Sequence, residues 1–184
     1  MHYANITLSG PSQEVVAAHL KERGLVAYVS PSVKGATVVW NEDLSSQESI
    51  ARELSSALEC PALLVMTYAQ RVLLYQLYES GELTDTYVSE HVEELLGASD
   101  TPAGDPQRLC DIFNRPSVVR RVGTILARAA KDDQPFAYAA NRHGELCSAL
   151  GLPSFAVGSS YGAIDRGEMP WGPEVDVGKI TQIS

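Results

Sequence analysis

A serine between two glycines is the first feature of the chain with the residue types for chemistry. Residues 158–162 read Gly-Ser-Ser-Tyr-Gly, the G-x-S-x-G pattern of the turn that presents a nucleophile in α/β-hydrolases. Ser160 would need a base to remove its proton and a carboxylate to orient that base. In that fold both partners follow the serine, but no histidine follows Ser160. We therefore expect a loop in which Ser160 is a small residue. Catalysis by Ser160 with His143 is the alternative.

His143 and Cys147 form a second candidate, because residues four apart on a helix share one face. Such a pair suits two metal ligands or an activated thiolate. Ala139, Leu146 and Leu150 belong to the same stripe, so we expect a buried face with a core cysteine beside a hydrogen-bonded histidine. The sequence holds no other His-x-x-x-Cys or His-x-x-x-His and no glycine-rich phosphate loop. We predict neither a metal site nor a cofactor.

Tyrosines in the middle of the chain are candidates for binding. Tyr75 and Tyr78 fall on opposite faces of one expected strand, because side chains alternate along a strand. Their neighbours Tyr68 and Tyr87 complete the set. Strands favour aromatic residues for packing alone, whereas interface cores are enriched in tyrosine. Trp171, between a proline and a glycine, is a further candidate anchor for the tail or for a partner.

Composition limits the classes of function. The chain has 184 residues, 45% of them hydrophobic, and a net charge of −9 from 14 basic and 23 acidic side chains. Such an acidic balance disfavours nucleic-acid binding and suits a basic protein partner. The three cysteines show no C-x-x-C spacing, and the N-terminus shows no signal-peptide pattern. The longest apolar run is too short to span a bilayer. We expect a cytoplasmic protein that does not enter a membrane.

The first half of the chain alternates strands and helices. Strands are expected in "ANITL", "LVAYVS", "ATVVW" and "ALLVMTY", with one helix opening at Ser12 and another behind a capping box at Ser45. The order strand, helix, strand, strand, helix, strand predicts a ferredoxin-like βαββαβ sheet in an α+β fold. "RVLLYQLYE" and "ELTDTYV" follow as a hairpin that extends the sheet in antiparallel fashion.

The second half is expected to be helical. Asp105-Pro106 predicts a helix start, and further helices are expected from about 117 and over 135–150, the last ending at Gly151. Residues 154–157 read as a short strand. We predict a sheet domain at 1–97, a linker at 98–106, a helical subdomain packed on the sheet at 107–165, and a loop-rich tail at 166–184 with one late strand.

Several of these segments resemble a family of bacterial proteins without an assigned activity. They are the hairpin "LLYQLYESGEL", the helix start Gly104-Asp105-Pro106, the helix "RHGELCSALGLP" and the "FAVG" that precedes Tyr161. The resemblance lies mainly within residues 61–167 and implies no catalytic residue.

The sequence therefore predicts a non-catalytic protein-interaction module, of the adaptor or immunity type, whose partner is another protein or a second copy of the chain. A small hydrolase or transferase that uses Ser160 and His143 is the first alternative. A protein that binds a small ligand between the sheet and the C-terminal helices is the second.

Overall fold

One antiparallel sheet runs through the centre of the molecule. The computed structural model describes residues 3–89, 103–128, 138–168 and 179–184. Seven strands pair in the order β6-β5-β4-β1-β3-β2-β7, so the α+β class and the antiparallel extension by β5 and β6 are confirmed. The strands are β1 (Tyr3–Ser9), β2 (Ala27–Val29), β3 (Ala36–Asn41), β4 (Ala62–Tyr68), β5 (Val72–Glu79), β6 (Glu82–Val88) and β7 (Thr181–Ile183).

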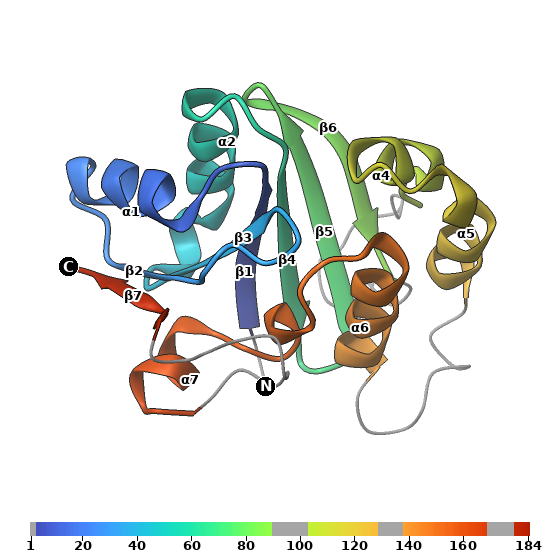
Figure 1. Ribbon diagram of the computed structural model, residues 1–184. Helices are drawn as coiled ribbons and strands as arrows, with labels where there is room; N and C mark the ends of the chain where they lie inside the picture. The colour runs from blue at the N-terminus through green and yellow to red at the C-terminus, as the bar shows by residue number, and fades with distance from the viewer. Residues whose placement is uncertain (1–2, 90–102, 129–137, 169–178) are drawn as a thin grey trace.

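Helices α1 (Gln13–Glu22) and α2 (Gln47–Ala57) cover one face of the sheet (Figure 1). Ser12 caps α1 as predicted, because its side chain accepts from the amide of Val15. The capping box predicted at Ser45 was wrong. Instead, the carboxylate of Asp43 accepts from the Ser45 amide at 2.8 Å and starts a 3₁₀ turn that leads into α2.

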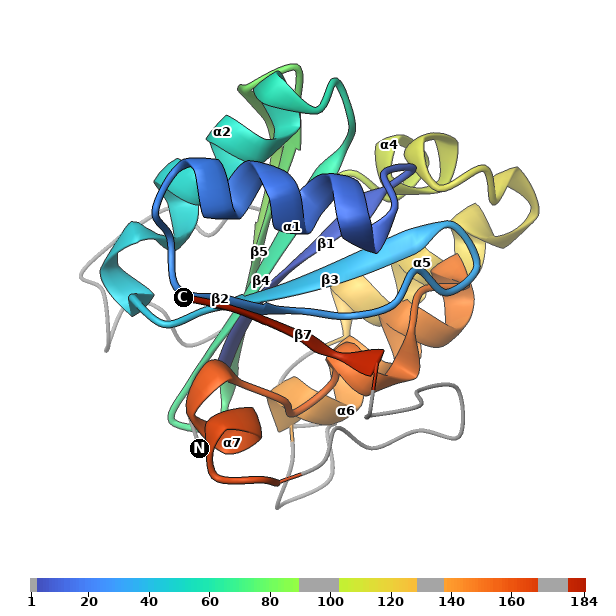
Figure 2. The same ribbon diagram turned by 60° about the vertical axis from the view of Figure 1, so that its left-hand side comes forward.

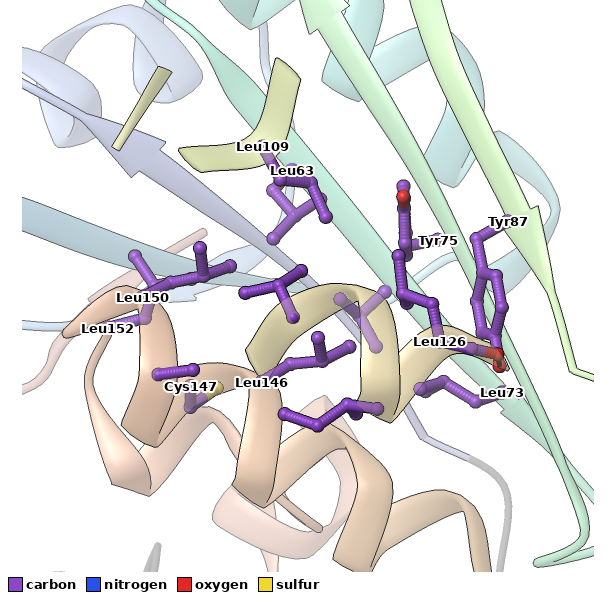
Figure 3. Packing of buried hydrophobic residues seen from close by; sticks show 14 of the residues in the cluster. Leu63, Leu73, Tyr75, Tyr87, Leu109, Leu126, Leu146, Cys147, Leu150 and Leu152 are labelled. Atoms are coloured by element: carbon purple, nitrogen blue, oxygen red, sulfur yellow. Dashed lines mark hydrogen bonds between the residues drawn. The ribbon is translucent and has the colours of Figure 1, made fainter. Parts of the chain in front are cut away.

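Within the described ranges, three helices cover the opposite face: α4 (Pro106–Ile112), α5 (Val119–Ala127) and α6 (Tyr138–Leu150) (Figure 1). Asp105 caps α4, as predicted, by accepting from the amides of Gln107 and Arg108. Figure 3 shows the core between these helices and the sheet. Leu146 and Leu150 of α6 meet Leu63 of β4 and Leu73 of β5 in one buried cluster. The middle of this interface is therefore filled with side chains.

The chain leaves α6 through a turn that places the glycine-serine segment. Gly151 has φ +74°, and the amide of Leu152 donates to the Cys147 carbonyl at 2.9 Å, which ends the helix. The strand predicted at 154–157 was wrong, because Ser154–Ala156 forms a 3₁₀ turn whose Phe155 is fully buried against Trp40. Helix α7 (Tyr161–Asp165) follows.

The C-terminal strand β7 lies beside β2 at the edge of the sheet (Figure 2), where Ala27 pairs with Ile183. The late strand predicted in the tail is therefore present. The predicted linker at 98–106 falls mostly outside the described residues, and the domain boundaries stay predictions. Within the described ranges, no helix has the length and apolar character needed to cross a membrane.

Candidate functional site

Ser160 has a structural task at the start of α7. Its backbone is extended, and its Oγ accepts from the amide of Ala163 at 3.2 Å, the geometry of an N-cap. The neighbouring Ser159 is buried and accepts the indole N–H of Trp40 at 3.0 Å. Both serine hydroxyl groups of the G-x-S-x-G segment therefore take part in local packing and capping.

His143 and Cys147 lie in the core, on the face of α6 that meets the sheet. The His143 Nδ1 atom is 2.9 Å from the hydroxyl of Tyr3 in β1. Burial lowers the pKa of His143 to about 4 and raises the pKa of Cys147 to about 12. At neutral pH the imidazole is therefore uncharged and the sulfur is a thiol, not a nucleophilic thiolate.

The structure does not join Ser160 to His143. In the described part of the chain, the side-chain hydrogen bond of His143 is to Tyr3, and that of Ser160 is to the Ala163 amide. Three or more His, Cys, Asp or Glu side chains arranged to hold a metal ion are not found among the described residues.

Tyr75 and Tyr78 are both 1% exposed, on opposite faces of β5. Tyr75 belongs to the core under the C-terminal helices, where its hydroxyl donates to Asp85 at 2.7 Å and its ring stacks on Tyr87. Tyr78 packs on the α2 side, and its hydroxyl donates to Gln76 at 2.8 Å. Trp171 lies outside the described residues.

A surface hollow of about 1020 Å³ opens beside α2, with Tyr78 in its wall. We call it the α2 hollow. One side is formed by Leu44 and the outward face of α2, and the other by the ends of β4, β5 and β6 on the same face of the sheet. Its location differs from the predicted one, since the expected ligand space lay on the opposite face, under the C-terminal helices.

Apolar side chains mark one end of the α2 hollow. Leu44 is 58% exposed and Tyr68 is 37% exposed, and both line it together with Met66. Only two other large hydrophobic side chains in the described ranges, Val15 and Leu83, are exposed. Half of the exposed large hydrophobic side chains therefore gather at this one hollow.

Charged side chains of α2 also line the hollow. The guanidinium carbon of Arg52 lies 5.7 Å from the centre of the Tyr78 ring, within reach of a cation–π contact. Glu48 accepts a hydrogen bond from Gln76 of β5 at 3.2 Å. Glu53 also lines the hollow, but Arg23 of α1, which does not line it, donates to this carboxylate and holds its pKa below the usual value.

Comparison with known protein families, with curated proteins and with solved structures finds no match for this chain. Its functional interpretation therefore depends on its own residues and their geometry.

The aromatic set singled out in the sequence includes two residues that line the hollow, Tyr68 and Tyr78. The exposed partner Leu44 was missed, because a single leucine in a turn before a helix carries no periodic signal. Arg52 was missed for a similar reason, since it lies on the polar side of the stripe formed by Ile50 and Leu54. A helical-wheel view of residues 47–57 could have placed Glu48 and Arg52 on one face.

Proposed function

We propose that the protein is a non-catalytic protein-interaction module, of the adaptor or immunity type, and that the α2 hollow is its contact surface. The observation that carries the proposal is that two exposed apolar side chains, Leu44 and Tyr68, line the same large hollow. Exposed apolar groups gathered within a polar rim are typical of protein-binding surfaces. The occupant is another protein or a second copy of this chain.

The enzyme alternative has less support. Ser160 Oγ is used to cap α7, and His143 is buried with its Nδ1 atom on Tyr3. The small-ligand alternative between the sheet and the C-terminal helices has less support as well, because apolar side chains fill the middle of that interface.

We also infer that β1 to β4 with α1 and α2 form a ferredoxin-like βαββαβ unit. The support is the strand order β4-β1-β3-β2 with antiparallel neighbours, and the two helices on one face. A cytoplasmic location is part of the proposal, and it is supported by Cys60, Cys110 and Cys147, all free thiols.

The test compares capture by three forms of the purified protein. Wild type, the double variant Leu44→Ser/Tyr68→Ser and the control Val15→Ser are immobilised, and proteins captured from the host lysate are quantified by mass spectrometry. Val15 is 50% exposed on α1 and does not line the hollow, so its variant removes a similar apolar group elsewhere.

We expect wild type and Val15→Ser to capture the same proteins and the double variant to lose them. Self-association is measured by light scattering coupled to size exclusion, where the same variants should convert any dimer to monomer. The proposal is wrong if the hollow variant captures the same set and keeps the same mass as wild type.

A further inference from the structure

Charge distinguishes the α2 hollow from an ordinary apolar groove. Three carboxylates line it, those of Glu48, Glu53 and Glu82, against one guanidinium, that of Arg52. Elsewhere in the described chain some surface carboxylates are ion-paired, such as Glu79 with Arg108 and Glu145 with Arg128, and others are not.

Two of the hollow's carboxylates are not ion-paired among the described residues. Glu53 pairs with Arg23, but Glu48 and Glu82 are exposed and have no cationic partner within 4.0 Å among the described residues. Arg52 lies over the Tyr78 ring without bridging either of them. The hollow therefore presents two open negative charges, on a chain whose net charge is −9.

The fold holds these two carboxylates at opposite ends of α2. Glu48 is in the first turn of the helix. Glu82 follows the turn at Gly81, whose amide donates to Ser55 at 3.4 Å and whose Cα packs so closely that an added Cβ would lie 3.0 Å from Ser56 Cβ. From Glu48 to Ser56 the helix rises about 12 Å, at roughly 1.5 Å per residue.

This rise along the helix is close to a repeat of an extended polypeptide. At about 3.3 Å per residue, side chains four residues apart on one face of a strand lie about 13 Å from each other. The apolar end of the hollow adjoins Glu48 on two sides. Leu44 lies one turn before Glu48 in the chain. Gln76, which donates to Glu48, is two residues from Leu74, and Leu74 pairs with Met66 in the sheet.

We propose that the partner segment is basic and extended. It would place two Lys or Arg side chains four residues apart on Glu48 and Glu82, and an apolar side chain beside the first of them against Leu44 and Tyr68. This inference rests on the proposed function and adds the chemistry of the partner. Charge complementarity of this kind raises the association rate and selects against acidic partners.

The experiment measures fluorescence anisotropy of labelled 12-residue probes, a length of about 40 Å when extended. The first probe has one leucine and two lysines four residues apart in a serine background, made in both sequence directions. The second replaces both lysines with glutamate. The third sets the lysines three residues apart, so that they fall on opposite faces of a strand.

We expect the first probe, in one direction, to bind more tightly than the other two. Glu48→Gln and Glu82→Gln should each weaken it by up to about fivefold, the size found for exposed ion pairs, and added salt should weaken it further. Glu22→Gln is the matched control, because it removes the same charge from an exposed site on α1 outside the hollow.

Equal loss with Glu22→Gln would mean that net charge alone attracts the probe, and would overturn the inference. So would equal binding of the glutamate probe, or no binding of either lysine probe direction. If capture from lysate still depends on Leu44 and Tyr68 in those cases, the protein-interaction proposal stands and only the basic partner is wrong.

Discussion

The hydroxyl of Tyr3 lies 2.9 Å from Nδ1 of His143, and this buried hydrogen bond ties the first strand to α6 across 140 positions of the chain. The two rings are stacked, with centroids 5.8 Å apart. Burial raises the pKa of Tyr3 and lowers that of His143, so both groups are uncharged at neutral pH. The histidine thus acts as a packed polar link between the sheet and the C-terminal helices.

The low pKa of His143 predicts that the free energy of unfolding decreases as the pH is lowered. The folded-state pKa is about 4, against an ordinary value near 6.5, so the unfolded chain binds a proton more readily than the folded chain. The contribution of the uncharged His143 to the free energy of unfolding is fully present above pH 6.5 and is lost as the pH falls toward 4. Below pH 4 it causes no further loss. It amounts to roughly 3 kcal/mol. Urea unfolding at pH 7.0 and pH 4.5 measures it.

Carboxylates also titrate near pH 4.5, so His143→Gln is the comparison that isolates the histidine. The variant should lose less stability than wild type between the two pH values, even if it is weaker at both. Equal losses in wild type and variant would contradict a depressed pKa for His143.

Removing the hydroxyl group of Tyr3 should lower the stability of the protein more than removing the hydroxyl group of an exposed tyrosine. Tyr3→Phe leaves a buried imidazole nitrogen without its partner, and we expect a loss of about 1 to 3 kcal/mol. The control is Tyr28→Phe, because the Tyr28 hydroxyl donates to Asp165 at 3.0 Å in an exposed contact. Its loss should stay below about 1 kcal/mol. Denaturant midpoints compare the two, and equal costs would mean that the link to His143 stabilises nothing.

The three cysteines should be inert toward thiol reagents in the folded protein. All are buried, and burial raises the pKa of Cys60 to about 11 and that of Cys147 to about 12. Little thiolate is present at pH 8, and access is blocked. A disulfide reagent that releases a coloured thiolate should therefore react slowly with the native protein. In urea, where the chain is unfolded, it should react with all three thiols. Rapid native labelling of Cys147, located by peptide mapping, would contradict this and revive the nucleophile hypothesis.

Much of the fold could be predicted because local pattern and tertiary packing agree. The continuous apolar run at 62–68, the apolar and aromatic segment at 72–79 and the Asp105-Pro106 helix start each predicted an element that the structure contains. The sequence predictions were wrong at Ser45, where a capping box was expected, and at 154–157, where a strand was expected. In both places a short 3₁₀ turn satisfies the backbone, through Asp43 in the first case and through the burial of Phe155 in the second. Such turns have no period that a sequence reading detects.

The candidate site was harder to predict, because it depends on where the chain goes after each element. Alternation places Tyr75 and Tyr78 on opposite faces of β5, but it does not show which helices cover each face. Both tyrosines are buried, whereas Tyr68, one strand earlier, is exposed at the end of β4. The hollow exists only because Leu44 and the β6 turn are brought to the same helix, which no local pattern encodes.

Gly104 should not tolerate a side chain. Its φ is +73°, and an added Cβ would collide with the Tyr75 hydroxyl and lie 3.1 Å from Tyr87 Cβ. We expect Gly104→Ala to lose about 2 to 4 kcal/mol, from left-handed backbone strain and from overpacking together. Gly167→Ala separates the two causes, since Gly167 has φ +77° with no atom within 4 Å of the added Cβ. Thermal unfolding should show a loss of about 1 kcal/mol there. Equal losses for Gly104→Ala and Gly167→Ala would mean that the Tyr75 side chain moves aside at little cost in stability.

The role of Ser160 separates a helix cap from a nucleophile. Ser160→Ala removes the acceptor for the Ala163 amide and should cost about 1 kcal/mol, the usual value for an N-cap. Ser160→Asp keeps an acceptor at the same place and should restore stability, although an aspartate cannot replace a serine nucleophile in acyl transfer. The two variants and wild type are compared by denaturant unfolding and by hydrolysis of an activated ester. A capping role requires that Ser160→Asp match wild type in both measurements. If wild type hydrolyses the ester faster than Ser160→Asp at equal stability, Ser160 is a nucleophile and the non-catalytic proposal is wrong.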